Sequence, residues 1–279
     1  MNKLTPERRA AVIRCLVEGN SIRATVRITG AAKNTIVKLL VEIGEVCSQY
    51  QNEALRELDC KRIQCDEIWS FVGCKQKNVP EEEKGRGERG DVWTWTGMDA
   101  DTKLMVSYRV GLRDGETGCE FMDDVAGRLK HRVQLTTDGQ KVYLDAVEDA
   151  FGGAVDYAML IKLYGNEAGG EKRYSPATCT GAKKEKIVGD PDWKHISTSY
   201  IERQNLTIRM SMRRFTRLTN AFSKKVENHA AAIALHFMYY NFARPHQTLS
   251  KPYPTTPAMA AGVADHVWTI GEIVALLSN

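Results

Sequence analysis

The chain has 279 residues, of which 43% are apolar and 27% are charged, a composition typical of globular proteins. This length accommodates one core of ordinary size and one smaller module, because single domains usually contain about 100 to 200 residues. No apolar run approaches the roughly 20 residues that a membrane span needs, and we see no signal peptide. Composition therefore predicts a soluble protein with no membrane partner.

Seven cysteines are scattered along the chain, and no two have the Cys-x-x-Cys spacing of a zinc or redox motif. Their odd number and irregular spacing also argue against a disulfide framework. We therefore expect structural cysteines in a reducing, cytoplasmic compartment.

The net charge is only +4, but it is unevenly distributed. The segment from Lys172 to Lys225 has 13 Lys and Arg against 4 Asp and Glu, so it carries +9 and leaves −5 for the rest of the chain. One strongly basic segment is typical of a protein with a polyanionic partner.

Residues 1–48 have the pattern of a small all-α module. Thr5 and Ser21 are expected to cap the first two helices, and a third helix, from about Ala31 to Val46, places apolar residues inward at three- and four-residue steps. This is typical of a helix-turn-helix unit, in which early residues of the last helix reach DNA. The candidates for DNA contact are Lys33, Asn34, Thr35 and Lys38. An ordinary three-helix interaction module with a solvated basic face is the alternative.

Residues 49–60 are polar and acidic and are interpreted as a linker, with a helical linker as the alternative to an irregular one. They precede the stretch from Arg62 to Val72, which has the apolar and β-branched character of a core strand but carries Asp66 and Glu67 in its middle. A buried carboxylate is unfavourable unless a cation or hydrogen-bond donors meet it. This pair therefore indicates a metal site, provided that partner acids come from elsewhere.

Alternating strands and helices follow. Strands are expected at 91–98, 104–110, 133–139 and 154–163, with helices at 114–130 and 143–151. The resulting order, β-β-β-α-β-α-β, is that of the ribonuclease-H-like fold, an α/β fold with a mixed sheet, which places the first and fourth strands side by side. Asp138 ends the fourth strand and would then lie near Asp66, although Asp-Gly is also a common turn dipeptide.

A third acid is expected on a helix after the fifth strand. In the segment that follows Tyr200, Glu202, Asn205 and Arg209 share one helical face, and Ser197 or Ser199 is the predicted cap. We expect Asn205 and Arg209 to position a scissile phosphate. An ordinary surface glutamate is the alternative for Glu202.

The segments beyond this helix are basic or helical. The helix is expected to continue past Met210, where Arg213, Arg214 and Arg217 are interpreted as a clamp on the DNA backbone. Residues 165–194, glycine-rich and basic, are interpreted as a flexible insertion that contacts DNA. Residues 221–279 form a helical C-terminal segment, in which the turn at Pro245 would bring Arg244 and His246 near the active site.

Several separated segments resemble the transposases of the bacterial and archaeal insertion-sequence-one group: Asp66-Glu-Ile-Trp-Ser-Phe-Val-Gly, Thr136-Thr-Asp-Gly, Tyr200-Ile-Glu-Arg-Gln-Asn-Leu-Thr, Asn241-Phe-Ala-Arg-Pro-His-Gln-Thr-Leu and Thr256-Pro-Ala-Met-Ala-Ala-Gly. The resemblance extends from about residue 20 to about residue 272. It implies a prokaryotic DDE transposase whose catalytic, metal-binding acids are Asp66, Asp138 and Glu202. Family members often carry an N-terminal cysteine zinc motif before the helix-turn-helix, whereas here Cys15 stands alone, so a shortened end-binding region or a truncated product is an alternative to a full-length transposase.

The implied organisation is a helix-turn-helix domain (1–48), a linker (49–60), a ribonuclease-H-like catalytic domain (61–220) and the helical C-terminal segment. Three acids suit two Mg2+ ions, with Mn2+ as the alternative, for strand cleavage and 3′-hydroxyl transfer between double-stranded DNAs by a homo-oligomer. The rival interpretations are a sequence-specific DNA-binding protein with vestigial acids and another ribonuclease-H-like enzyme, such as a resolvase or an RNA-strand nuclease.

Overall fold

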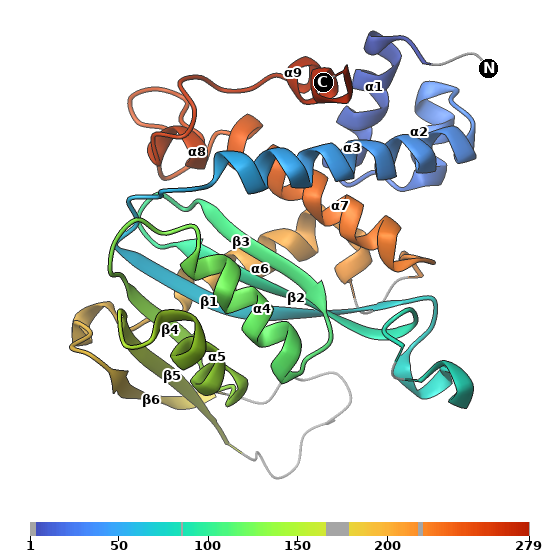
Figure 1. Cartoon of the computed structure of the whole chain (residues 1–279). Coiled ribbons are helices and arrows are strands. Elements are labelled where there is room, and N and C mark those ends of the chain that lie inside the picture. Colours follow the sequence, from blue (N-terminus) through green and yellow to red (C-terminus); the bar gives the residue numbers. More distant parts are fainter. Residues whose placement is uncertain (1–3, 85, 166–178, 217–219, 279) are drawn as a thin grey trace.

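A computed structural model describes residues 4–84, 86–165, 179–216 and 220–278. Over this part of the chain the protein is a mixed α/β structure built on a six-stranded sheet and nine α-helices (Figure 1). None of the helices described is both long enough and apolar enough to cross a membrane.

The sheet has the strand order β3-β2-β1-β4-β5-β6. The central strand β1 pairs antiparallel with β2 and parallel with β4; β4 and β5 are parallel, and β6 closes the far edge antiparallel to β5. The strand bounds are β1 (Arg62–Val72), β2 (Gly90–Asp99), β3 (Met105–Gly111), β4 (Gln134–Asp138), β5 (Asp156–Tyr164) and β6 (Cys179–Val188).

The sixth strand was not predicted from the sequence. Part of the glycine-rich segment 165–194, expected to be a flexible insertion, forms β6, and residues 166–178 lie outside the described residues. None of the residues of the strand is buried, and Lys183 and Lys186 are exposed, because the strand lies at the sheet edge. Such a strand has no apolar alternation for a sequence pattern to detect, and lysines are common at protected sheet edges.

Helices cover both faces of the sheet. Helices α4 (Gly115–Ala126) and α5 (Val142–Phe151) lie together on one face, and α6 (Ser199–Ser211) lies on the other, against β1 and β2 (Figure 1). Helix α6 ends at Ser211, earlier than expected, and a short 3-10 turn, Arg213–Phe215, follows it. Further 3-10 turns are Gln76–Asn78, Glu81–Glu83, Trp193–His195 and Leu276–Ser278.

Three N-terminal helices precede the sheet: α1 (Pro6–Val17), α2 (Ile22–Thr29) and α3 (Lys33–Ala54). Thr5 and Ser21 cap α1 and α2 through their side-chain oxygens, as predicted. Helix α3 is longer than expected, because its second half packs along α7 (Val226–Met238) and buries residues such as Cys47 and Gln51. Its Gly44 lies so close to Ala231 that a Cβ there would come within 2.5 Å of Ala231.

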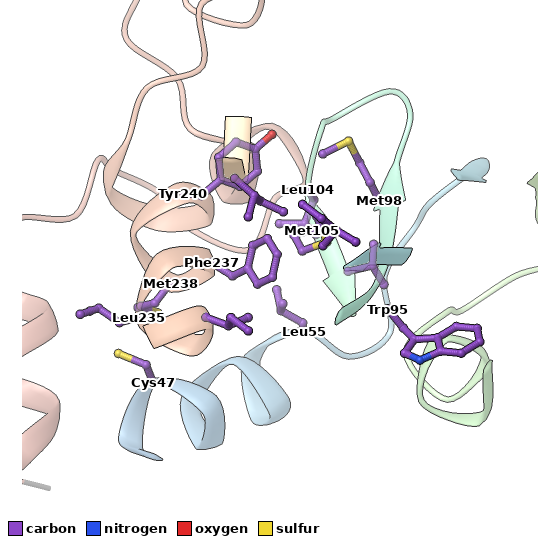
Figure 2. Packing of buried hydrophobic residues seen from close by; sticks show 14 of the residues in the cluster. Cys47, Leu55, Trp95, Met98, Leu104, Met105, Leu235, Phe237, Met238 and Tyr240 are labelled. Carbon is purple, nitrogen blue, oxygen red and sulfur yellow. The ribbon is translucent and has the colours of Figure 1, made fainter. Parts of the chain in front are cut away.

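Helix α7 joins the N-terminal helices to the sheet. Figure 2 shows Phe237 pointing from α7 towards the β2–β3 hairpin, and its ring centroid lies 4.8 Å from that of Tyr108 on β3. A π-helical turn, Tyr239–Ala243, continues α7, and α8 (Pro257–Ala260) and α9 (Ile270–Ala275) follow, with α9 against α1. One continuous apolar core therefore connects both ends of the chain with the sheet.

The edge strand β3 is covered by the side chain of Asn241. Its Nδ2 donates to the carbonyl of Met105 and its Oδ1 accepts from the Met105 N–H, both at 3.0 Å, and Asn241 is fully buried. One amide side chain thus satisfies both polar groups of a buried edge residue that has no neighbouring strand on that side.

Substitution of Asn241 by Leu should lower the free energy of unfolding by roughly 2 to 4 kcal/mol, because it leaves two buried backbone groups unpaired. Asn78→Ala, on an exposed turn, is the matched control and should change stability by less than about 0.5 kcal/mol. Urea titration of both variants measures the difference. Equal midpoints for the two would show that the Met105 pairing contributes nothing.

Candidate metal centre

The site lies where β1 runs past the end of β4. In the pairing of the two strands, Arg62 lies opposite Gln134 and Gln64 lies opposite Thr136, so paired residues differ by 72 in residue number. Asp66 and Asp138 also differ by 72, so the same register sets them level with each other. The carboxyl end of β4 therefore places two acids at the edge of the sheet where ligands bind in α/β folds.

Asp66 is held by two hydrogen bonds. Its carboxylate accepts from the backbone N–H of Glu67 at 2.9 Å and from Nδ2 of Asn205 at 2.8 Å. Burial, together with the negative charges of Asp138 and Glu67, raises the pKa of Asp66 to about 7. A carboxylate in this position is half protonated at neutral pH unless a cation compensates its charge.

Asp138 has the same tendency. Burial raises its pKa above the ordinary value, although its carboxylate accepts a hydrogen bond from the backbone N–H of Gln140 at 3.0 Å. The bond closes a tight turn, so both sequence interpretations of this residue apply: Asp138 makes a turn and faces the cluster of acids.

Glu67 joins these two acids. Ligand oxygens of Asp66, Glu67 and Asp138 all lie within 4.8 Å of one another, a spacing that can hold a metal ion. The buried Glu67 also pairs with Arg113, with Nη2 and Nε at 2.6 and 2.7 Å, and accepts from the Tyr143 hydroxyl at 3.0 Å. Burial and the charge of Asp138 nevertheless raise its pKa.

The sequence named Glu67 as one half of an acidic pair but did not place it among the site residues. Adjacent residues of a strand normally face opposite sides of the sheet, which hid its role. Arg113, the partner of Glu67, comes from a loop with no pattern that a sequence reveals.

Glu202 lies in the same cleft but is bonded differently. Its carboxylate accepts from Nζ of Lys162 and from the hydroxyl of Thr198, both at 2.5 Å, and it is not a member of the three-acid group. Burial alone would lower the pKa of Lys162, but the hydrogen bond and charge of Glu202 raise it overall. Lys162, on β5, was not predicted as a site residue.

Helix α6 is positioned by Gln64 in addition to one of the predicted serines. The Oε1 of Gln64 accepts from the backbone N–H groups of Tyr200 and Ile201 at 2.9 and 3.2 Å, and the Thr198 hydroxyl is engaged by Glu202. Ser197, one of the two predicted caps, accepts from the backbone N–H of Ser199 at 3.2 Å, whereas the next two N–H groups of the first turn are satisfied from β1, two residues before Asp66. This contact fixes where Glu202 and Asn205 stand relative to Asp66.

A cleft of about 550 Å³ contains these groups. Four acids and three basic residues line it, together with the amide of Asn205: Asp66, Glu67, Asp138, Glu202, Arg113, Lys162 and Arg209. Asn205 is buried and donates to Asp66, so it orients a carboxylate instead of contacting a phosphate as expected. The predicted common face of Glu202, Asn205 and Arg209 does point into one cleft.

The predicted DNA contacts occupy different positions. Lys33, Asn34, Thr35 and Lys38 are exposed on the first turns of α3, with Lys38 paired to Glu42 at 3.6 Å. Arg213 is exposed, and Arg217 lies outside the described residues.

Arg214 does not have the position of a surface clamp. Its Nη1 donates to Oγ of Ser223 at 2.5 Å and to the carbonyl of Asn228 at 3.4 Å, and burial lowers its pKa to about 10. Its guanidinium therefore bonds to other parts of the fold and not to solvent or a ligand. A count of charges in the sequence does not reveal such contacts.

Arg244 and His246 do not line the acidic cleft. They line a second one on the other flank of α6. The histidines of α7, His229 and His236, are buried, and burial lowers their pKa values to about 3 and about 4. His229 bonds to Ser70 and Ser223 in the core, so it is a packing residue.

No protein-family model matches the chain, and no curated protein matches it significantly. Function therefore has to be inferred from the chemistry of the site.

In metal-free protein, Asp66→Asn should raise stability at pH 8 by on the order of 2 kcal/mol and change it little at pH 4. Between about pH 4 and pH 7 the folded state retains a proton on Asp66 that the unfolded chain has lost, so the free energy of unfolding falls as the pH rises. The amide removes this penalty and keeps the size of the side chain.

Thermal unfolding in EDTA at both pH values measures the effect. Asp123→Asn, on the exposed face of α4, is the matched control and should show no such difference. A pH-independent gain in Asp66→Asn would mean that its carboxylate is not held against the charge of its neighbours.

Proposed function

We propose that the chain is a DDE transposase, similar to those of the insertion-sequence-one group, that cleaves element ends and transfers the freed 3′-hydroxyl into target DNA. One observation carries this proposal. Asp66, Asp138 and Glu202, distant in the sequence, line a single cleft that also contains Lys162 and Arg209. Acids for metal ions beside cations for phosphate form a donor set suited to phosphoryl transfer.

The fold supports the same proposal. A first strand in the centre, antiparallel to the second and parallel to the fourth and fifth, is the arrangement of ribonuclease-H-like domains. The helices α1 to α3, with exposed Lys33 and Asn34 at the start of α3, suit a helix-turn-helix unit for double-stranded DNA. Because a transposase joins two element ends, we propose a homo-oligomer on DNA in the prokaryotic cytoplasm.

The residues fit divalent metal ions. The donors are carboxylate oxygens, which Mg2+ and Mn2+ prefer, and burial raises the pKa values of Asp66 and Asp138, with the charges of Asp138 and Glu67 adding to the shift of Asp66. We infer that Asp66, Asp138 and Glu202 hold two Mg2+ ions, or Mn2+ in their place. When bound, these ions supply charge stabilisation for the attacking and leaving oxygens.

The surrounding residues prepare the acids for this task. Asn205 orients Asp66, and Arg113 together with Tyr143 holds Glu67, so that Glu67 supports the shape of the site. An ion held by these acids would favour the ionised form of Asp66 and would compete with Lys162 for the carboxylate of Glu202. Lys162 would then be placed to meet a phosphate oxygen, beside Arg209 in the same cleft.

Glu202→Gln tests the catalytic assignment directly. It keeps the size of the side chain but removes a metal-binding charge, so Mg2+-dependent nicking and joining of a labelled native element end should fall by at least about 100-fold with unchanged DNA binding. Glu148→Gln, on the exposed side of α5, is the control and should retain activity.

The products of this assay separate the rival functions. Binding without cutting by the wild type, under any divalent ion, would favour a sequence-specific DNA-binding protein with vestigial acids. Cutting without joining would favour a resolvase or another ribonuclease-H-like nuclease, since only a transposase transfers the end to a second DNA.

Lys162→Met should tighten divalent-metal binding by about two- to five-fold. In the wild type the metal ion has to displace Lys162 from Glu202, and this partly exposed ion pair contributes roughly 0.5 to 1 kcal/mol. Mn2+ titration followed by thermal shift measures it. Lys183→Met removes a similar pair with Glu185 on the edge strand β6 and should leave Mn2+ affinity unchanged. Weaker Mn2+ binding in Lys162→Met would show that Lys162 helps to form the metal site and does not compete with the ion for Glu202.

A further inference from the structure

A second cleft, of about 330 Å³, lies on the opposite flank of α6 from the acids. The helix contributes Tyr200, Arg203, Gln204 and Thr207 to it, spaced by three, four and seven residues along one face, whereas Glu202, Asn205 and Arg209 face the acidic cleft. The β2–β3 turn and the loop after the π-helical turn form the remaining walls.

Cations collect in this cleft. Lys103, Arg203 and Arg244 line it with His246, and its lining includes no carboxylate. The side chains of Arg203 and Arg244 have no ion-pair partner among the residues that the structure describes. The nearby acids are engaged elsewhere: Asp101 pairs with Arg62, and Asp99 accepts from Thr102. Like charges gathered without a counter-charge are unfavourable, so this arrangement suits an anionic ligand.

Lys103 occupies a strained position in the wall of the cleft. It has a positive φ of 62°, and its ammonium lies 3.7 Å from the ring centroid of Tyr200. The Tyr240 hydroxyl donates to the Lys103 carbonyl at 3.0 Å, which ties this turn to the π-helical segment. A non-glycine residue held in the left-handed region by several contacts is a common feature of binding sites.

Gln204 supplies a second, independent indication. It is only 3% exposed and lines the cleft, yet its Nε2 has no hydrogen-bond partner within the part of the chain that the structure describes. A buried amide donor without an acceptor is unfavourable by about 1 to 3 kcal/mol. A ligand oxygen in the cleft would satisfy it.

We propose that the cleft formed by Lys103, Tyr200, Arg203, Gln204, Arg244 and His246 binds a backbone phosphate of the DNA strand that passes through the acidic cleft. This deepens the proposed function and rests on it. The two clefts are separated by the width of a helix, about 10 Å. The phosphate held here is therefore one that lies within a few nucleotides of the reacting phosphate on the same strand.

The salt dependence of DNA binding tests the contact without any catalysis. In EDTA, with a labelled duplex, Arg203→Ala and Arg244→Ala should each lower affinity several-fold and reduce the slope of log affinity against log salt by about 0.9. Arg86→Ala, on the exposed β1–β2 loop, removes the same charge at a site that the proposal does not involve. Slopes in the two cleft variants equal to that of Arg86→Ala would overturn the proposal.

Neutral methylphosphonates, substituted one at a time along the strand, locate the contacted phosphate. The wild type should lose affinity at one position within a few nucleotides of the cleaved bond, and Arg244→Ala should lose no more there, because the two changes remove the same contact. Fully additive losses at every position would contradict the assignment.

Two further results separate the sources of failure. In the first, inorganic phosphate stabilises the wild type, but not Arg244→Ala, against thermal unfolding, and the salt slopes of DNA binding in the cleft variants equal that of Arg86→Ala. This result would assign the cleft to free phosphate and overturn the DNA contact. Wild type that binds DNA but neither cuts nor joins it would overturn the proposed function, whereas slopes equal to the control in an active enzyme would overturn only the second site.

Discussion

The register between β1 and β4 is the constraint on which the site depends. Parallel pairing over only three residue pairs sets Asp66 level with Asp138, and β1 then continues without β4 as its neighbour. A shift by one residue would turn Asp66 to the other face of the sheet, away from Asn205. The buried apolar residues that flank the pair, such as Cys65 and Leu135, make such a shift unfavourable.

Electrostatic repulsion is the consequence of that register. Asp66, Glu67 and Asp138 lie within reach of one ion, and each has a raised pKa. Arg113 offsets part of the charge through Glu67, and Lys162 offsets Glu202, whereas Asp66 accepts from the neutral N–H groups of Glu67 and Asn205 and Asp138 accepts from that of Gln140. The structure thus retains a carboxylate pair whose ionised form is favoured by an added cation.

The sequence predicted the parts of this arrangement that depend on local patterns. Five strands, the mixed α/β class, the caps at Thr5 and Ser21 and the shared face of Glu202 and Arg209 all follow from periodicity and capping chemistry. The predicted roles of Asp66, Asp138 and Glu202 remain predictions, because the positions of these side chains do not by themselves demonstrate a reaction.

The features that were missed depend on contacts between distant segments. Gln64 caps α6 across 136 residues, and Glu67 pairs with Arg113 across 46. The edge strand β6 exists because β5 offers it a partner, and the second half of α3 is helical because α7 covers it. A local pattern contains none of these partners, and the same holds for Arg214, whose charge suggested a surface position.

Helix α6 links the two clefts mechanically as well as chemically. Its first turn is bonded to Gln64 on β1, so the helix cannot rotate without breaking contacts beside Asp66. Rotation that moved Glu202 towards the acids would also move Arg203 and Gln204 relative to Lys103 and Arg244. If the second cleft binds a DNA strand as proposed, that strand would restrain the helix that carries Glu202, so that occupation of one cleft would favour the correct geometry in the other.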